Sequence, residues 1–343
     1  SLLHNKILIV SILILIQLFV FFGIVFKLSE YFVAIYFILI ALSFCMSIYI
    51  INKNDNPTYK LTWVLLIMAV PVFGGLIYLL FGGQKVPKEL RKRDSEALEN
   101  YQEISWQNTE IMEALEAEDP LAHKQANYLW KNAIFPIYNH TETTYFPVGE
   151  EKFKAMVEEL KKAESFIFME YFIIAPGVMW DTILDILIDK VKQGVEVRVM
   201  YDDAGCITTL PQDYYLTLRR LGIQAKVFNP IKPRLAMQMN NRDHRKILVI
   251  DGKVGMTGGI NLADEYINQK ERFGHWKDCS VMIRGEAVWN LTLMFLQFWN
   301  YDEKEKDDVF SYKPDFKVFE NIHNDGYVQP YSDSPTDEEN VGE

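Results

Sequence analysis

Three long apolar runs near the N-terminus constrain the fold of this 343-residue chain more than any other feature. They extend from Ile7 to Phe26, from Tyr31 to Ile51 and from Leu61 to Phe81. Each run has about 20 residues, so as an α-helix rising ~1.5 Å per residue it is long enough to cross a hydrocarbon core of ~30 Å. We therefore predict a transmembrane anchor of two to three helices over residues 1–83. Pro71 and Gly74 should bend the third helix, as membrane helices tolerate.

The first apolar run has a second interpretation, as a cleaved signal peptide. It is longer than the ~7–15 residues of a signal-peptide core, and no small-x-small cleavage site precedes Lys27. A retained helix is therefore favoured. The turn between the second and third runs contains two lysines, whereas five basic residues follow the third run: Lys85, Lys88, Arg91, Lys92 and Arg93. This bias predicts a multi-pass cell-membrane protein whose C-terminal part is cytoplasmic, with the basic cluster near anionic headgroups.

Composition excludes several classes of protein. The net charge of −11 argues against a general nucleic-acid binder, which normally presents a basic face. Cys45, Cys206 and Cys279 are isolated and show neither CxxC nor metal-ligand spacing, which argues against a disulfide framework and a zinc site. We expect a reducing compartment, no metal and no cofactor.

The segments after the anchor differ in pattern. Residues 88–119 are charged with scattered apolar positions, which predicts amphipathic helices that end before Pro120, within a helical linker over residues 84–145. Beyond it, apolar strand-like runs alternate with helical spacing. We predict strands at 165–174, 195–201, 224–228 and 247–250 and helices at 180–193 and 214–221, which is an α/β domain with a sheet flanked by helices.

One motif in this domain carries chemistry. Residues 244–261 read H-x-K-x4-D-x6-G-G-x-N, with His244, Lys246, Asp251 and Asn261 at the polar positions. Alternate residues of an extended chain project to the same side, so His244 and Lys246 should point the same way. An imidazole nucleophile beside a fixed ammonium suits phosphoryl chemistry. The alternative is a solvated polar cluster at a sheet edge.

Several separated segments resemble one family. Residues 170–174, 194–198, 241–246, 258–261 and 274–278 resemble the phospholipase D superfamily, and within it the bacterial membrane-bound cardiolipin synthases. The resemblance extends along nearly the whole chain and includes Asn56-Pro57 before the last apolar run. It implies N-terminal transmembrane helices followed by an α/β phospholipase D-like domain, here residues 146–318.

The chain departs from this family in having one motif. The resemblance to cardiolipin synthases of this type implies two tandem repeats, each with its own H-x-K-x4-D motif. The sequence of this chain contains only the first motif. Residues 326–335 resemble the opening strand of a second repeat, so we expect residues 319–343 to begin a truncated second repeat. The alternatives are a single-motif phosphodiesterase that works as a homodimer, and an inactive membrane-anchored fragment.

The resemblance implies an activity and roles for the motif residues. Two phosphatidylglycerols would give cardiolipin and glycerol, with His244 carrying the phosphatidyl group as a phosphohistidine. Lys246 and Asn261 would bind the phosphoryl oxygens. A second histidine, from the missing repeat or a second subunit, would act as acid and base. The partners are phosphatidylglycerol and other anionic membrane lipids, with no nucleic acid.

Three further carboxylates are candidates with open alternatives. Asp251 either contacts substrate or closes a tight turn beside Gly252. By resemblance Asp278 opens the next strand and would orient His244, against a plain surface turn. Glu170 lies between apolar residues, where a carboxylate needs a partner. It would hold a site lysine or the acid histidine, or else make a structural hydrogen bond.

The remaining features receive structural interpretations. The Asp202-Asp203 pair invites a metal site, but a turn at the strand end is favoured because no third ligand has a matching spacing. His275 is expected to be a loop residue rather than a substrate contact. We expect Phe273, Trp276, Trp299 and residues 295–296 in the core. The apolar loop 235–239 is expected to pack against protein rather than to contact acyl chains.

Overall fold

The computed structural model of the chain describes most of the residues after position 106 and parts of the segment before it. The described residues are 15–23, 32–53, 57–70, 73–82, 106–230, 242–300, 307–324 and 326–333. The chain divides into two compact units, one formed by residues 1–85 and 232–240 and the other by residues 86–231 and 241–343.

The first unit is helical. Its helices after residue 31 are α2 (Phe32–Asn52), α3 (Pro57–Ala69) and α4 (Gly74–Phe81), and residues 15–23 are also helical. Among the described residues one helix, spanning Val33–Asn52, is long and apolar enough to cross a membrane. Most of its apolar side chains face outward, as in Val33, Phe37 and Phe44. A helix with exposed apolar side chains is typical of a lipid environment.

The third apolar run differs from a single span. The described residues form two helices, because α3 ends at Ala69 and α4 begins at Gly74. This matches the interruption expected at Pro71 and Gly74. Ile50, Ile67 and Tyr78, one from each helix, form the buried cluster of this unit. Of the first run, only residues 15–23 are described.

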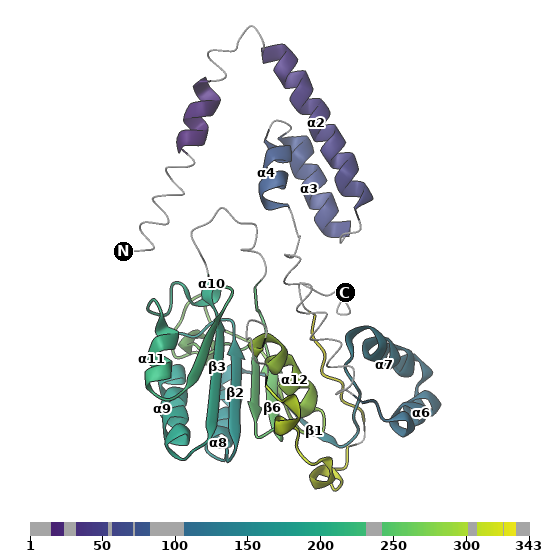
Figure 1. Ribbon diagram of the computed structural model, residues 1–343, viewed down its shortest axis with the longest axis vertical. Coiled ribbons are helices and arrows are strands. Elements are labelled where there is room, and N and C mark those ends of the chain that lie inside the picture. Colours follow the sequence, from purple (N-terminus) through teal and green to yellow (C-terminus); the bar gives the residue numbers. More distant parts are fainter. Residues whose placement is uncertain are drawn as a thin grey trace. The chain divides into compact units, whose positions relative to one another are not determined.

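The second unit is built on a mixed seven-stranded sheet (Figure 1). Its order is β1-β7-β6-β5-β2-β3-β4. The pairs β2–β3 and β3–β4 are parallel, and the other neighbours are antiparallel. The strands are β1 (Thr141–Phe146), β2 (Phe166–Tyr171), β3 (Glu196–Asp202), β4 (Gln224–Phe228), β5 (Ile247–Ile250), β6 (Val254–Gly258) and β7 (Ser280–Gly285).

Helices cover both faces of the sheet (Figure 1). On one face pack α8 (Gly149–Leu160), α9 (Val178–Lys192) and α11 (Tyr214–Arg220), and on the other packs α12 (Val288–Trp299). Alternation along β5 decides the direction of its side chains. Leu248 and Ile250 join the core under α8 and α9, whereas Ile247 and Val249 join the core under α12. The strands and helices predicted between residues 165 and 250 are confirmed within a few residues at their ends, whereas residues 88–105 of the predicted amphipathic segment lie outside the described residues.

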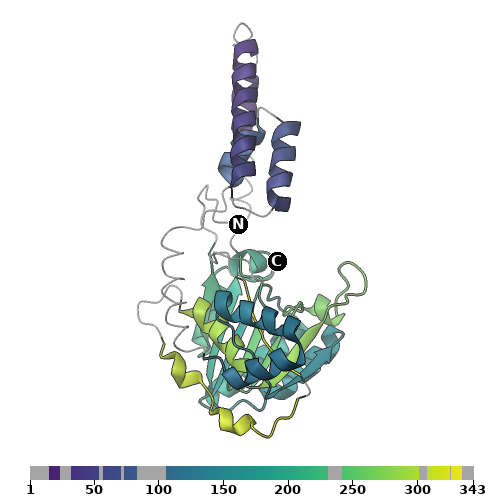
Figure 2. The ribbon, with the colours of Figure 1, turned by 90° about the vertical axis from the view of Figure 1, so that its right-hand side faces the viewer.

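Two helices lie beside the sheet as a pair (Figures 1 and 2), α6 (Thr109–Glu118) and α7 (Pro120–Ala133). The Asp119 carboxylate accepts hydrogen bonds from the first backbone amides of α7, and Pro120 occupies the first turn. The predicted helix end before Pro120 is therefore confirmed. The sheet starts at Thr141, inside the segment expected to be a linker. Val328 pairs with Tyr138, so residues from both expected flanking segments pack within this unit.

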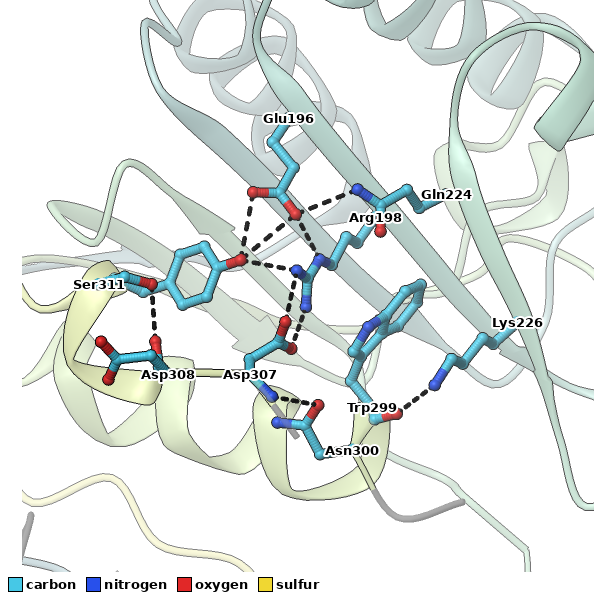
Figure 3. A network of polar contacts seen from close by, with 10 residues as sticks. Glu196, Arg198, Gln224, Lys226, Trp299, Asn300, Asp307, Asp308 and Ser311 are labelled. Atoms are coloured by element: carbon cyan, nitrogen blue, oxygen red, sulfur yellow. Dashed lines mark hydrogen bonds and ion pairs between the residues drawn. The ribbon is translucent and has the colours of Figure 1, made fainter. Parts of the chain in front are cut away.

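A buried ion-pair network holds the segment after α12 against β3 (Figure 3). Arg198 is 4% exposed and donates to both carboxylate oxygens of Asp307, at 2.5 and 3.1 Å. It also donates to Glu196 and to the hydroxyl of Tyr312, which lies in the 3-10 helix η3 (Val309–Tyr312). Lys226 donates to the carbonyl oxygen of Trp299. These contacts lie near the start of β3, away from the strand end that approaches His244.

The expected core is correct with one exception. Phe295, Leu296 and Trp299 are buried, and Trp276 is partly buried against the core. Phe273 was expected in the core, but its side chain is 79% exposed. The prediction was wrong because hydropathy alone does not distinguish a buried aromatic residue from one at a loop tip. The 235–239 loop lies outside the described residues.

Candidate active site

The motif residues meet where the strands β2 and β6 end and the strands β5 and β7 begin, and this end of the strands is called the site edge of the sheet. The end of β2 lies beside the start of β5, since Glu170 pairs with Ile247. The end of β6 lies beside the start of β7, since Gly258 pairs with Ser280. The loop before β5, the loop after β6 and the residues before β7 therefore converge. The antiparallel connections bring together residues that are far apart in the sequence.

His244 is the exposed nucleophile candidate at this edge. Its imidazole is accessible to solvent and lies beside the ring of Phe172, with the ring centroids 4.9 Å apart and the planes tilted by 59°. Partial burial and the positive charge of Lys246 lower the pKa of His244 below its usual value, while Asp243 opposes them. A lowered pKa favours the neutral imidazole, which is the nucleophilic form.

Lys246 places a cation next to His244. Its side chain is 2% exposed, and the ammonium donates to the carbonyl oxygen of His244 and lies 5.5 Å from the Phe172 ring centroid. Burial lowers the pKa of Lys246 to about 8, and the charges of Asp243 and Asp278 oppose that shift. The ammonium is therefore charged in most molecules at neutral pH.

Asn261 joins the loop after β6 to the end of β2. Its side-chain oxygen accepts from the amide of Ile173 at 2.9 Å, and its nitrogen donates to the hydroxyl of Tyr266 at 2.8 Å. The amide group is 2% exposed and held at both ends. One N–H of the nitrogen is committed to Tyr266, which leaves the other for a substrate oxygen. Its expected contact with a phosphoryl group stays a prediction.

Asp278 lies beside the two glycines of the motif. Its carboxylate accepts from the amide of Cys279 at 2.8 Å and packs so closely on Gly259 that a Cβ there would come within 2.1 Å of an oxygen. The negative charge of Asp278 opposes the lowering of the pKa of Lys246 and of Lys152 that burial causes. Among the described contacts none joins Asp278 to His244, so its expected orienting role stays a prediction.

Asp251 lies at the other end of β5. Its backbone is in the left-handed region, at φ 54°. Its carboxylate accepts hydrogen bonds from three consecutive backbone amides, those of Glu164, Ser165 and Phe166, at 2.8–2.9 Å. These bonds fasten the start of β2 to the end of β5. The structure thus gives Asp251 side-chain to backbone bonds, as the alternative interpretation expected, but to a neighbouring strand rather than to its own turn.

Glu170 is fully buried on the α12 side of the sheet. Its Oε1 accepts from Nε of Arg245 at 2.5 Å. Its Oε2, and Oδ2 of Asp243, are buried and have no donor partner in the described structure. Burial raises the pKa of Glu170 well above its usual range, with Asp243 adding to the effect and Arg245 opposing it. A protonated Glu170 would donate to Asp243, and this hydrogen bond is one of the causes of the raised pKa of Glu170. The cation at Glu170 is an arginine rather than the expected site lysine.

The sequence interpretation missed Lys152. This residue of α8 is fully buried, donates to the carbonyl oxygen of Ile260 at 3.0 Å, and lies 5.2 Å from the Tyr171 ring centroid. Burial lowers the pKa of Lys152 to about 7, with Asp278 opposing and Lys246 adding to the shift. A signal was present, because Lys152 lies one and two turns before Met156 and Leu160 on the apolar stripe of its helix.

Asp202 also supports the site. Its Oδ1 accepts from the amides of Ala204 and Gly205 at the start of α10 (Asp203–Cys206), and its Oδ2 accepts from the amide of Asp243. The structural interpretation of this acidic pair, a turn at the strand end, is confirmed. The bond to Asp243 fastens the residue before His244. Among the described residues no group of three or more His, Cys, Asp or Glu side chains is placed to hold a metal ion.

Two family models match the sequence. The one described as "Cardiolipin synthase, PLD-like domain" matches residues 156–275, and the one described as "Phospholipase D-nuclease N-terminal" matches residues 33–83. The first match contains Lys246, His244 and Asn261. The second covers α3, α4 and all of α2 except its first residue.

Curated relatives match most of the chain. An uncharacterized protein from Streptococcus mutans is 46% identical over 301 residues, which is 86% of this chain and 64% of that protein. The cardiolipin synthase of Alkalihalophilus pseudofirmus is 39% identical over 76% of this chain and 52% of its own length. The cardiolipin synthase of Geobacillus thermodenitrificans is 36% identical over 79% of this chain and 54% of its own length. The chain thus spans about half the length of these synthases.

A solved structure is similar at a lower level. The phospholipase D family member Nuc from Salmonella typhimurium is 17% identical and covers 49% of this chain and 98% of its own, with a TM-score of 0.35. The sequence matches decide the family. The chain belongs to the phospholipase D superfamily and is similar to cardiolipin synthases, with their N-terminal module and one phospholipase D-like domain.

Proposed function

We propose that this chain supplies one half of a phosphatidyl-transfer site that converts two phosphatidylglycerols into cardiolipin and glycerol. The observation that carries the proposal is the exposed imidazole of His244 beside the enclosed ammonium of Lys246. The names of the relatives that are 34–39% identical to this chain support the choice of reaction. The anionic lipids of the membrane are the expected substrates and partners.

The first step forms a bond from an imidazole nitrogen of His244 to the phosphorus of a phosphatidylglycerol. The bond from phosphorus to the glycerol headgroup oxygen breaks, and the leaving oxygen takes a proton from an acid. In the second step the hydroxyl of another phosphatidylglycerol loses a proton to the same group and attacks phosphorus. The phosphorus–nitrogen bond breaks, and His244 is restored.

Lys246 and Asn261 stabilise the charge that develops on the phosphoryl oxygens. The ammonium of Lys246 is enclosed by protein, where a fixed charge acts more strongly than in water. The remaining N–H of Asn261 is a neutral donor. Both groups are held by bonds to the backbone or to Tyr266, so little reorganisation is needed when charge develops.

The acid and base come from a second histidine. The full H-x-K-x4-D pattern occurs once in the sequence, so a second copy of the motif has to supply that histidine, from further sequence or from a second subunit. The homodimeric phosphodiesterase is the corresponding alternative, in which water is the acceptor and phosphatidic acid the product.

We further propose that the protein is a multi-pass protein of the cell membrane with its catalytic domain in the cytoplasm. The apolar helix α2 and the match to the N-terminal family support the anchor. The five basic residues between Lys85 and Arg93 support the cytoplasmic side. An anchored site works at the bilayer surface, where both lipid substrates are concentrated.

The experiment is reconstitution into phosphatidylglycerol vesicles. The chain alone and a form extended to the length of its synthase relatives are compared, with cardiolipin, glycerol and phosphatidic acid followed over time. We expect cardiolipin and glycerol in equal amounts from the extended form, and a large loss with the chain alone. Acid-quenched protein should carry a phosphatidyl group on His244.

The matched variants are His244→Ala and His323→Ala, which removes an exposed histidine outside the site. His244→Ala should abolish both transfer and labelling, and His323→Ala should change neither. Phosphatidic acid as the main product would replace the synthase by a hydrolase. Transfer that persists in His244→Ala would overturn the assignment of the nucleophile.

A further inference from the structure

A loop at the same edge of the sheet presents an exposed aromatic side chain. Residues 270–277 read KERFGHWK and join the 3-10 helix η2 (Asp264–Ile267) to Asp278 and β7. Phe273 at its tip is 79% exposed, more than any other large hydrophobic side chain described between residues 106 and 333. Transfer of a phenylalanine side chain from water to an apolar environment is favourable. A partner surface that covers Phe273 would therefore stabilise this conformation of the loop.

The exposure comes from a fastened loop. Asn268 accepts from the amide of Trp276 at 2.7 Å and donates to its carbonyl oxygen at 3.0 Å, and it also donates to Glu150. Arg272 forms an ion pair with Glu265 at 2.9 Å. These bonds hold both sides of the loop, so its tip is presented outward rather than collapsed on the sheet.

The charges around Phe273 fit an anionic surface. Three basic residues of the loop are exposed: Lys270, Arg272 and Lys277. Glu271 is the acidic residue of the loop, so the loop is basic although the net charge of the chain is −11. Arg272 lies 5.2 Å from the Phe273 ring centroid. An exposed aromatic ring flanked by basic side chains is typical of segments that lie in the interface of anionic membranes.

The loop is joined to the candidate active site by direct contacts. The rings of Phe273 and Trp276 lie 6.2 Å apart, and those of Trp276 and Tyr266 lie 4.8 Å apart. Tyr266 accepts the hydrogen bond of Asn261. The tip of the loop therefore belongs to the same packed structure as the donor expected to bind phosphate.

We propose that the 270–277 loop is a membrane-contact element, in which Phe273 enters the boundary between headgroups and acyl chains while Lys270 and Lys277 face lipid phosphates. This contact turns the sheet edge that carries His244 toward the bilayer. The choice of a lipid surface rests on the proposed function. A second copy of the chain or another protein is the competing occupant.

The test measures the depth of position 273 in a bilayer. A nitroxide is attached to Phe273→Cys in the full chain, with Cys45, Cys206 and Cys279 replaced by alanine, in vesicles of phosphatidylglycerol and phosphatidylcholine. The matched label is placed at Leu221, a partly exposed apolar residue just before β4, which is the outermost strand on one side of the sheet. Collision of each label with oxygen, which partitions into lipid, is compared with collision with a water-soluble nickel complex.

We expect the ratio of oxygen to nickel collisions to be several-fold higher at 273 than at 221, and to fall when phosphatidylglycerol is omitted. Equal ratios at the two positions would show a water-exposed loop and overturn the proposal. A decrease in both collision rates at 273 would show a protein contact and overturn it as well. The measurement needs no turnover and is repeated with His244→Ala, so its outcome is independent of the proposed reaction.

Discussion

The ammonium of Lys152 lies 3.0 Å from the carbonyl oxygen of Ile260, the residue that precedes Asn261 in the motif. A helix residue thus reaches under the sheet edge and supports the loop that presents Asn261. The charges of Asp278 and Lys246 both influence the pKa of Lys152, in opposite directions. The site therefore contains two buried lysines near one carboxylate, although the motif names only one of them.

The first prediction concerns Lys152→Met and pH. Burial lowers the pKa of Lys152 from 10.5 to about 7, so between these pH values the unfolded chain binds more protons than the folded one. The stability of the wild type then rises with pH in that window, and the variant lacks this contribution. We expect the variant to lose about 2 kcal/mol relative to the wild type between about pH 7 and pH 9.

The measurement is chemical unfolding in detergent at both pH values. Lys161→Met, an exposed lysine just after the same helix, serves as the control for removal of a surface charge. A difference between the wild type and Lys152→Met that is independent of pH would show that the ammonium is not titrating in the folded protein near neutrality.

The second prediction concerns the influence of Lys246 on His244. The positive charge of Lys246 helps to lower the pKa of His244, so Lys246→Met should raise that pKa, although burial still acts on it. The measurement is the imidazole carbon chemical shift of selectively labelled histidine as a function of pH. Lys277→Met removes an exposed lysine near the same edge and is the matched control. An unchanged His244 titration in Lys246→Met contradicts the prediction.

The third prediction separates the two interpretations of Asp251. The carboxylate accepts from three backbone amides, so Asp251→Asn loses part of this set and should destabilise the protein by about 2 kcal/mol. Asparagine tolerates the left-handed backbone at this position, so strain does not confuse the result. The activity of each folded molecule should be retained.

Unfolding curves and transfer rates are compared for Asp251→Asn and for Asp315→Asn. Asp315 accepts from a single amide, that of Lys317, and should cost less than about 1 kcal/mol. A large loss of turnover in Asp251→Asn with unchanged stability would instead support a catalytic role.

The fourth prediction concerns Glu170. A glutamine reproduces the protonated carboxyl group, since it can donate to Asp243 and accept from Arg245. Because the pKa of Glu170 is raised in the folded protein, its protonated carboxyl group contributes fully to the free energy of unfolding below pH 4.5. This contribution is lost as the pH rises through the folded-state pKa. The stability of Glu170→Gln relative to the wild type should therefore increase as the pH rises above 4.5.

Glu170→Leu is the contrasting variant for the same unfolding measurements. It removes the Glu170 carboxyl group from the partly buried Arg245 and the buried Asp243, which should cost about 3 kcal/mol. If glutamine and leucine are equally destabilising at every pH, the carboxyl group does not carry the proton in the folded protein.

Local patterns predicted the elements because each pattern depends on neighbouring residues. The apolar run around α2, the strand-like runs of β2, β3 and β5, and the helix that ends before Pro120 are visible within short windows. The motif residues were found in the same way, by spacing alone. The order of strands in the sheet was not predicted, because pairing between distant strands has no local signal.

Two side chains show why the rest of the site needed the structure. Lys152 and Ile260 are 108 residues apart in the sequence, and only the packing of α8 against the sheet makes the lysine part of the site. Phenylalanine is usually a core residue, so the sequence suggested that Phe273 is buried. The structure shows Phe273 exposed, in a loop held by the hydrogen bonds of Asn268 and Arg272.

The sequence by itself therefore determined the apolar helix, the alternating α/β domain, the H-x-K-x4-D motif and the family. The tertiary structure alone decided that Asp251 fastens two strands, that Glu170 faces an arginine, and that Lys152 lies behind the motif. Secondary structure follows from period and propensity within a few turns of chain. The partners of a buried charge follow from which strands become neighbours, and that is decided by the packing of the whole domain.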